Sequence, residues 1–240
     1  MWIKKWDSLP HKFINEHVQK YYDTLYKRRK ELLYKRIFDV VVSIILLIII
    51  LPLIILVSIL IKIDSNGAVI FKQIRITQYG KRFKILKFRS MYVNFENTGN
   101  YLTIKNDSRV TKVGKYLRRY RLDEIPQLFN ILSGDMSFVG TRPEVLKYVI
   151  RYNEEMMATL LLPAGLTSQA SIDFKDEDNI LNFFCNADDM YVNVILPKKM
   201  QINLFNVINY SFFNDLKILL NTALYIFIKN EYCNDNADMK

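Results

Sequence analysis

The chain has 240 residues, half of them hydrophobic, and a formal net charge of +10. This length allows one domain of moderate size, or one domain with a membrane element. A basic protein attracts anions such as nucleic acid, an anionic membrane surface or a phosphorylated substrate. The sequence has two cysteines and two histidines, both histidines near the N-terminus, which excludes a His-rich or Cys-rich metal site from the body of the chain. A metal ion there must be bound by oxygen, which favours magnesium or manganese over zinc.

The first 36 residues predict a basic amphipathic helix. Apolar residues recur at helical spacing between positions 10 and 34, and six Lys and Arg residues occur between positions 27 and 36. We expect this segment, residues 1–36, to lie on a membrane surface, where each cation near anionic lipid contributes about 1 kcal/mol. The alternative is a helix whose charged face is simply solvated.

Residues 40–61 are almost purely apolar, with interruptions at Ser43, Pro52 and Ser58. About 20 such residues suffice to cross a bilayer. However, a proline in mid-run kinks or breaks a helix. Both flanks are also basic, whereas a membrane span carries its excess of cations on the cytoplasmic flank. We therefore expect residues 37–62 to form a re-entrant membrane helix hairpin, broken at Pro52, that returns to the face it entered. A full span is the alternative.

Two short strands are expected after the apolar run. Residues 68–73 and 82–88 have the composition of strands, and the Tyr79-Gly80-Lys81 turn between them predicts a short β-hairpin. Residues 94–108 are polar and rich in Asn, which indicates a loop.

The rest of the chain predicts helices. Helices are expected at residues 111–120, 144–162 and 212–228, the last either at the membrane interface or closing the core. The acidic, Asn-rich residues 173–189 are interpreted as a solvated loop rather than a metal site. Residues 229–240 are expected to be a polar tail. The fold class is therefore α+β, mainly helical, with a membrane hairpin and a small cytoplasmic domain over residues 63–228.

Two adjacent carboxylates, Asp123 and Glu124, lie between clusters of arginine. Arg118 and Arg119 precede the pair, and Arg142 follows it in a turn. Arginine pairs with phosphate oxygens, and a carboxylate can bind magnesium or attack phosphorus. The same acidic pair, followed by a proline, is also typical of an ordinary helix start with Asp123 as the N-cap.

Four short motifs occur in a fixed order beside the Pro-interrupted apolar run. They are KRIFD at 35–39, a segment from FKQ at 71–73 to KFRSM at 87–91, LDEIPQL at 122–128 and GDMSFVG at 134–140. In this order they resemble the bacterial sugar transferase family, the monotopic phosphoglycosyl transferases that begin glycan assembly on polyprenyl phosphate. The resemblance extends from about residue 35 to residue 225, and it places Arg36, Asp39 and Pro52 in the membrane hairpin.

The resemblance implies a reaction. A UDP-sugar gives its phosphosugar to polyprenyl (undecaprenyl) phosphate, and UMP leaves, in the first membrane step of a surface glycan pathway. Asp123 would be the nucleophile and form a covalent phosphosugar intermediate. Glu124, together with Asp123, would hold Mg²⁺.

The resemblance also implies the substrate contacts and the location. Arg142 would bind a substrate phosphate, with further phosphate contacts from four cations (Lys87, Arg89, Arg118 and Arg119). The expected location is the cytoplasmic face of the bacterial inner membrane, in contact with membrane lipid.

The sequence departs from the family pattern in three places. Many relatives have Pro-Arg-Pro where this chain has Thr141-Arg142-Pro143, and many have Ser where Leu51 precedes the hairpin proline. After residue 167 the family's Trp-Gln pattern is absent, which leaves the identity of the sugar open. A homodimer is also left open.

Two other functions compete with the transferase. The first is a non-catalytic membrane scaffold for glycan assembly enzymes, against which the intact Asp123-Glu124 pair argues. The second is a nucleic-acid binder. The apolar run and the lack of a recognisable nucleic-acid-binding motif argue against it, so no nucleic acid partner is expected.

Overall fold

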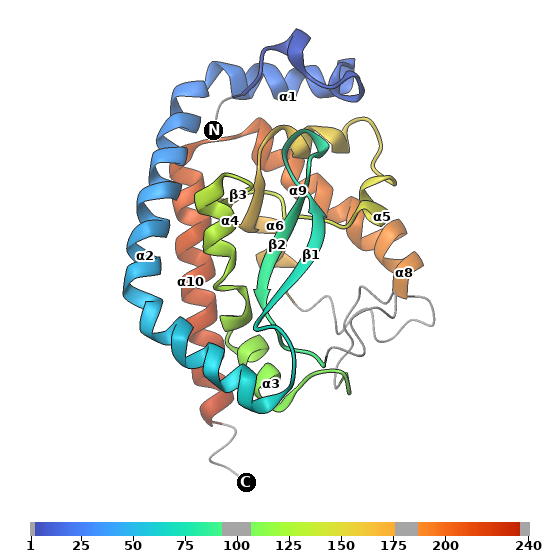
Figure 1. Cartoon of the computed structure of the whole chain (residues 1–240). Coiled ribbons are helices and arrows are strands. Elements are labelled where there is room, and N and C mark those ends of the chain that lie inside the picture. The colour runs from blue at the N-terminus through green and yellow to red at the C-terminus, as the bar shows by residue number, and fades with distance from the viewer. Residues whose placement is uncertain (1–2, 93–106, 176–186, 236–240) are drawn as a thin grey trace.

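The computed structural model describes residues 3–92, 107–175 and 187–235, and these form a mainly helical molecule with two small sheets (Figure 1). The principal elements, in chain order, are α1 (Glu16–Lys27), α2 (Arg29–Asp64), β1 (Ile70–Ile76), β2 (Arg82–Phe88), α3 (Lys112–Arg119), α4 (Gln127–Ser133), β3 (Met136–Val139), α5 (Leu146–Val149), β4 (Ala164–Thr167), α6 (Gln169–Asp173), α8 (Ala187–Met190), α9 (Leu196–Ile208) and α10 (Phe212–Asp235).

The predicted β-hairpin is confirmed. Strands β1 and β2 pair antiparallel, with Ile70 opposite Phe88 and Ile76 opposite Arg82. The first strand lies slightly later than the predicted 68–73. At the turn, Tyr79 has a left-handed φ of 56°.

A second sheet was not predicted. Strands β3 and β4 pair in parallel, with Met136 opposite Ala164 and Val139 opposite Thr167. From the sequence, the Pro163–Thr167 segment predicts a turn that ends the helix at 144–162, whereas residues 164–167 form β4. Two close glycines allow the strands to meet at one end, because a Cβ added at Gly165 would lie 2.2 Å from the backbone of Gly140.

Helix α2 runs through Pro52 without interruption, so the predicted break into two helices is wrong. The helix bends instead along its lower half (Figure 1). A proline removes one backbone hydrogen bond, which kinks a helix without ending it when the flanking residues continue to favour helix. Within the described residues, α2 is the one helix long and apolar enough to cross a membrane. One side of it is exposed and apolar, including Ile44, Ile48 and Ile55.

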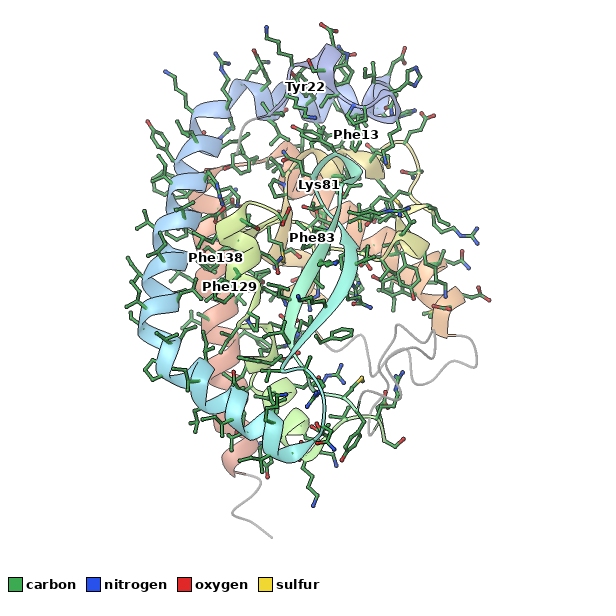
Figure 2. The ribbon with its side chains drawn as sticks, in the orientation of Figure 1. Phe13, Tyr22, Lys81, Phe83, Phe129 and Phe138 are labelled. Carbon is green, nitrogen blue, oxygen red and sulfur yellow. The ribbon has the colours of Figure 1, made fainter. Side chains whose placement is uncertain are left out.

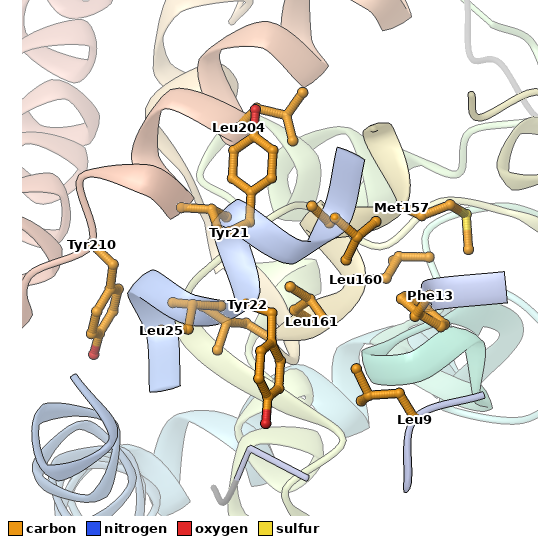
Figure 3. Packing of buried hydrophobic residues seen from close by; sticks show 14 of the residues in the cluster. Leu9, Phe13, Tyr21, Tyr22, Leu25, Met157, Leu160, Leu161, Leu204 and Tyr210 are labelled. Atoms are coloured by element: carbon orange, nitrogen blue, oxygen red, sulfur yellow. The ribbon is translucent and has the colours of Figure 1, made fainter. Parts of the chain in front are cut away.

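The N-terminal segment packs on the body of the protein. Phe13, Val18 and Leu25 are fully buried, and their cluster includes Leu161 and Leu204 (Figure 3). The apolar face of α1 is therefore covered by protein, and the predicted contact of the basic segment with a membrane surface stays a prediction. Amphipathic periodicity indicates that a helix face is covered but not by what. The basic residues 27–30 remain exposed.

Of the other predicted helices, one is confirmed, one is divided into two short helices and one is longer than predicted. The segment 111–120 is helical as α3, with the Thr111 hydroxyl accepting a hydrogen bond from the Gly114 amide. Residues 144–162 do not form one helix but two short ones, α5 and a 3₁₀ helix at Met156–Leu161. Helix α10 begins as predicted and runs past residue 228 to Asp235. Residues 94–106 and most of the acidic stretch lie outside the described residues.

A second hydrophobic cluster joins β2, β3 and α4 to helix α2. Phe83 of β2 and Phe138 of β3 belong to it (Figure 2), together with Leu128 and Ile131 of α4. Partly buried residues of α2, such as Phe38, pack against this cluster. The hairpin, α4 and the parallel strands are thereby held around the segment that connects α3 to α4.

Candidate active site

Asp123 and Glu124 lie in the 3₁₀ turn Leu122–Glu124, between α3 and α4. Arg121 precedes them with a left-handed φ of 57°, which turns the chain sharply out of α3. The N-cap of α4 is Pro126, with no side-chain capping bond. Asp123 is therefore not the N-cap, and the interpretation of the pair as an ordinary helix start is wrong.

Glu124 joins three segments that are distant in sequence. Its Oε1 accepts a hydrogen bond from Lys87 Nζ of β2 at 2.9 Å and another from Arg142 Nη2 at 2.5 Å. Arg142 stands in the turn after β3, and its Nη1 also donates to the carbonyl oxygen of Leu166 at 3.3 Å. The structure thus brings together Glu124, Lys87 and Arg142, three of the residues predicted for the site.

The two carboxylates have opposite electrostatic environments. Burial disfavours the charged form of Glu124, but Arg142 and Lys87 outweigh burial and hold its pKa well below the usual value. Burial raises the pKa of Asp123, and Lys87 opposes this rise only in part. Burial also lowers the pKa of Lys87, against the attraction of Glu124. Glu124 is thus a fixed anion, whereas Asp123 is the carboxylate more easily neutralised.

The predicted arginines divide into two groups. Arg118, at the end of α3, lies near enough to Asp123 to favour its charged form. Arg119 is exposed, with its guanidinium 5.6 Å from the Tyr120 ring centroid. Arg89 is 3% exposed and donates to the Ser65 carbonyl at 2.6 Å, beyond the C-terminal end of α2. Arg89 therefore binds the C-terminal end of α2, where a cation is favoured, and Arg119 is exposed to solvent.

The KRIFD motif connects α2 to the body. Arg36 donates to the carbonyl oxygens of Ile131 and Leu132 at the end of α4, at 2.6 and 2.9 Å. Asp39 accepts a hydrogen bond from the Phe138 amide of β3 at 3.3 Å. Lys35 Nζ forms a buried ion pair with Asp215 of α10.

Arg75 and Glu144 belong to the same region and were not predicted. Arg75 Nη1 donates to the Pro143 carbonyl at 3.2 Å, and the Arg75–Glu144 ion pair measures 3.9 Å. The hydroxyl of Tyr191 donates to Glu144. The predicted strand ends at residue 73, and in the sequence Arg75 is only one of several cations that follow the apolar run. The sequence signal that could have identified Arg75 is the alternation of side chains along a strand, which puts residues 73 and 75 on one face.

The expected magnesium ligands are the carboxylates of Asp123 and Glu124. Within the described residues, no group of three or more His, Cys, Asp or Glu side chains could hold a metal ion. Magnesium, however, is commonly bound by one or two carboxylates together with substrate phosphates and water. Asp123 and Glu124 supply two carboxylates beside cations that can bind those phosphates.

Comparison with known proteins gives a consistent family. A family model described as "Bacterial sugar transferase" matches residues 30–229. A UDP-glucose:undecaprenyl-phosphate glucose-1-phosphate transferase of Klebsiella pneumoniae is 35% identical over 82% of the chain and 41% of that protein. A UDP-N-acetylgalactosamine-undecaprenyl-phosphate N-acetylgalactosaminephosphotransferase of Aeromonas hydrophila is 33% identical over 78% and 42%. An uncharacterized sugar transferase of Bacillus subtilis, EpsL, is 32% identical over 82% and 89%. The chain spans about two fifths of the length of the first two relatives.

Proposed function

Because the chain belongs to the bacterial sugar transferase family, we propose that it moves a phosphosugar from a UDP-sugar to polyprenyl phosphate and releases UMP. The observation that carries this proposal is the Asp123-Glu124 pair, in which Asp123 is buried and Glu124 bonds to both Lys87 and Arg142. The Klebsiella and Aeromonas relatives are named for transfer of a sugar phosphate to undecaprenyl phosphate. Undecaprenyl phosphate is therefore the proposed acceptor, and the reaction is the first membrane step of a surface glycan pathway.

The proposed first step is attack by Asp123 on the donor. An Asp123 carboxylate oxygen forms a bond to the phosphorus that carries the sugar, and the bond from that phosphorus to the oxygen shared with UMP breaks. UMP leaves with the bonding electrons. Lys87 and Arg118 favour the charged form of Asp123 that this attack needs. Phosphoryl transfer depends mainly on positioning and charge neutralisation, which these cations supply.

The second step regenerates the enzyme. A phosphate oxygen of the polyprenyl phosphate attacks the same phosphorus, the bond to Asp123 breaks, and polyprenyl diphosphate sugar forms. Arg142 and Lys87, which both donate to Glu124, are the proposed ligands of the substrate phosphate oxygens in both steps. Magnesium held by Glu124 and Asp123 would add neutralising charge to those phosphates.

The proposed location is the cytoplasmic face of the bacterial inner membrane, with α2 entering and leaving on that face. Both ends of α2 contact the same body. Arg36 bonds to the end of α4, and Val57 and Ile61 pack with Phe88 and Leu117. A helix that crossed ~30 Å of hydrocarbon would place its ends on opposite sides of the bilayer. These contacts therefore support a re-entrant helix, bent rather than broken, over a full span.

Release of UMP tests the reaction. Purified protein in a membrane mimic is supplied with magnesium, undecaprenyl phosphate and a panel of UDP-sugars. We expect release with at least one sugar that requires the lipid. Asp123→Asn should reduce turnover by about 10³-fold or more, because a neutral amide is a poor nucleophile, and the variant should stay in the membrane fraction.

The control is Asp135→Asn, which neutralises a carboxylate that pairs with exposed Lys81 instead. Full turnover by Asp123→Asn would remove Asp123 as nucleophile. If no UDP-sugar releases UMP and no labelled phosphosugar can be trapped on Asp123, a non-catalytic membrane scaffold becomes the better account.

A further inference from the structure

We infer that Arg75 is a positioning residue that holds the turn after β3 so that Arg142 meets Glu124. The inference rests on the proposed function, since it assigns a role in the same reaction. It concerns the turn formed by residues 140–144, which carries Arg142 between β3 and α5.

Arg75 contacts the turn directly after Arg142. Its Nη1 donates to the Pro143 carbonyl at 3.2 Å, and its guanidinium faces the Glu144 carboxylate at 3.9 Å. The neighbouring amide of Ile76 donates to the Glu144 carbonyl at 3.0 Å. Strand β1 therefore fixes the turn through both a side chain and the backbone.

The other side of the turn is fixed by the parallel strands. Gly140 donates its amide to the Thr167 carbonyl at 3.0 Å, and Gly165 donates to the Thr141 carbonyl at 2.9 Å. Arg142 thus lies between backbone bonds to β4 on one side and the Arg75 contacts on the other. Because the backbone of the turn is held on both sides, the Arg142 side chain has less freedom to lose when it pairs with Glu124.

The β1–β2 hairpin carries both Arg75 and Lys87. Arg75 lies opposite Phe83 in the register, and Lys87 lies opposite Phe71 nearer the other end of the same hairpin. Lys87 bonds to Glu124 directly, whereas Arg75 acts on Glu124 through the turn that carries Arg142. The β1–β2 hairpin therefore sets the distance between Lys87 and Arg142 across the carboxylate.

The hydrogen bonds of Arg75 favour positioning over direct contact with substrate. Its Nε and Nη2 donate to the Gln73 side-chain oxygen at 2.9 and 2.7 Å, and its Nη1 donates to Pro143. Each guanidinium nitrogen thus already has a protein acceptor. A lysine at this position would keep the charge but could not reach Gln73 and Pro143 in this fork geometry.

A double-mutant cycle tests the role. We expect Arg75→Lys to lower kcat/KM for UMP release about tenfold, mainly through kcat. In an Arg142→Lys background the same change should cost less than about twofold, because the guanidinium that Arg75 helps to position is already removed. The matched control is Arg82→Lys, an exposed arginine on β2 of the same hairpin, which should leave both backgrounds unchanged. An equal loss in both backgrounds, or no loss in the wild-type background, would overturn the inference.

A second variant and a second readout separate this inference from the proposed function. Tyr191→Phe removes the hydroxyl that donates to Glu144, so it should show the same non-additivity with Arg142→Lys. Amide hydrogen exchange should rise in peptides covering residues 74–77 and 140–146 of Arg75→Lys, but not in Arg82→Lys. If the wild type neither releases UMP nor traps a phosphosugar on Asp123, the proposed function fails and exchange alone decides. Unchanged exchange in Arg75→Lys would then overturn the positioning role.

Discussion

Asp123 and Glu124 are adjacent carboxylates in different electrostatic environments. Glu124 is bonded to two cations, and its low pKa keeps it charged at neutral pH. Burial raises the pKa of Asp123, whose stabilising cations act mainly by charge. Two carboxylates whose environments push their pKa values apart are typical of sites in which one group reacts and the other organises.

Replacement of Lys87 by an uncharged residue should move the low-pH side of the pH–activity profile to higher pH. Lys87 is the cation that most favours the ionised form of Asp123, while burial opposes that form. Lys87→Gln therefore raises the pKa of Asp123 further, and the rise of kcat/KM with pH should begin at higher pH than in the wild type. In the wild type that rise should already lie above the ordinary Asp value of 3.8. The measurement is UMP release as a function of pH.

The control for this shift is Lys84→Gln, which removes an exposed cation from the same strand. Its profile should match the wild type after scaling. A Lys87→Gln profile that is lower at every pH without moving along the pH axis would contradict the coupling of Lys87 to Asp123.

At the residue scale, the sequence predicted residues that the structure brings together in the candidate site, but not all of their contacts. Lys87 and Arg142 were predicted and do bond to Glu124. Arg89, predicted beside Lys87, lies at the end of α2 instead, because β2 ends at Phe88 and the chain leaves the sheet there. Arg75 was missed because sequence motifs show residue types. They do not show which distant segment a side chain contacts.

The elements that the sequence predicted best are those stabilised by neighbours in the chain. Strands β1 and β2 form a local hairpin, so the run of strand residues and one turn sufficed. Strands β3 and β4 have four residues each and pair in parallel across a long connection. No local pattern indicates such pairing. The predicted helix at 144–162 failed because the chain breaks between α5 and the 3₁₀ helix, where Asn153 caps the Met156 amide.

A methyl group at Gly165 should separate the two parallel strands. The added Cβ would lie 2.2 Å from the nitrogen and oxygen of Gly140, so the backbone must move. Gly165→Ala should lower the free energy of unfolding by about 1–3 kcal/mol, as overpacking does. It should also reduce UMP release, because the displaced strand end carries the turn with Arg142. Thermal unfolding and activity are measured together.

The comparison is Ala68→Val, which enlarges an exposed residue before β1. This variant should change neither quantity. If Gly165→Ala kept both wild-type stability and activity, the close contact of the two strands would not be needed to hold the turn.

For the whole molecule, the sequence separated apolar from polar surfaces but did not identify what covers each apolar surface. The faces of α1 and α2 are both apolar. The first is buried against the body, with Leu25 fully covered, and the second leaves Ile48 and Ile63 mostly exposed. A buried face and a lipid-facing one can have the same periodicity. Only the tertiary contacts distinguish them.

The two ends of α2 should be accessible from the same face of the membrane. Single cysteines replace the exposed residues Lys30 and Lys72, one before and one after α2, in a variant in which Cys185 and Cys233 are serine. A membrane-impermeant thiol reagent should label both positions in inverted inner-membrane vesicles and neither in intact spheroplasts. A cysteine at Ile48, on the exposed apolar side, should react only after detergent is added. Because the body contacts both Arg36 and Ile61, a full span would pull one contact apart. Labelling of Lys30 and Lys72 from opposite faces would therefore establish a span and reject the re-entrant helix.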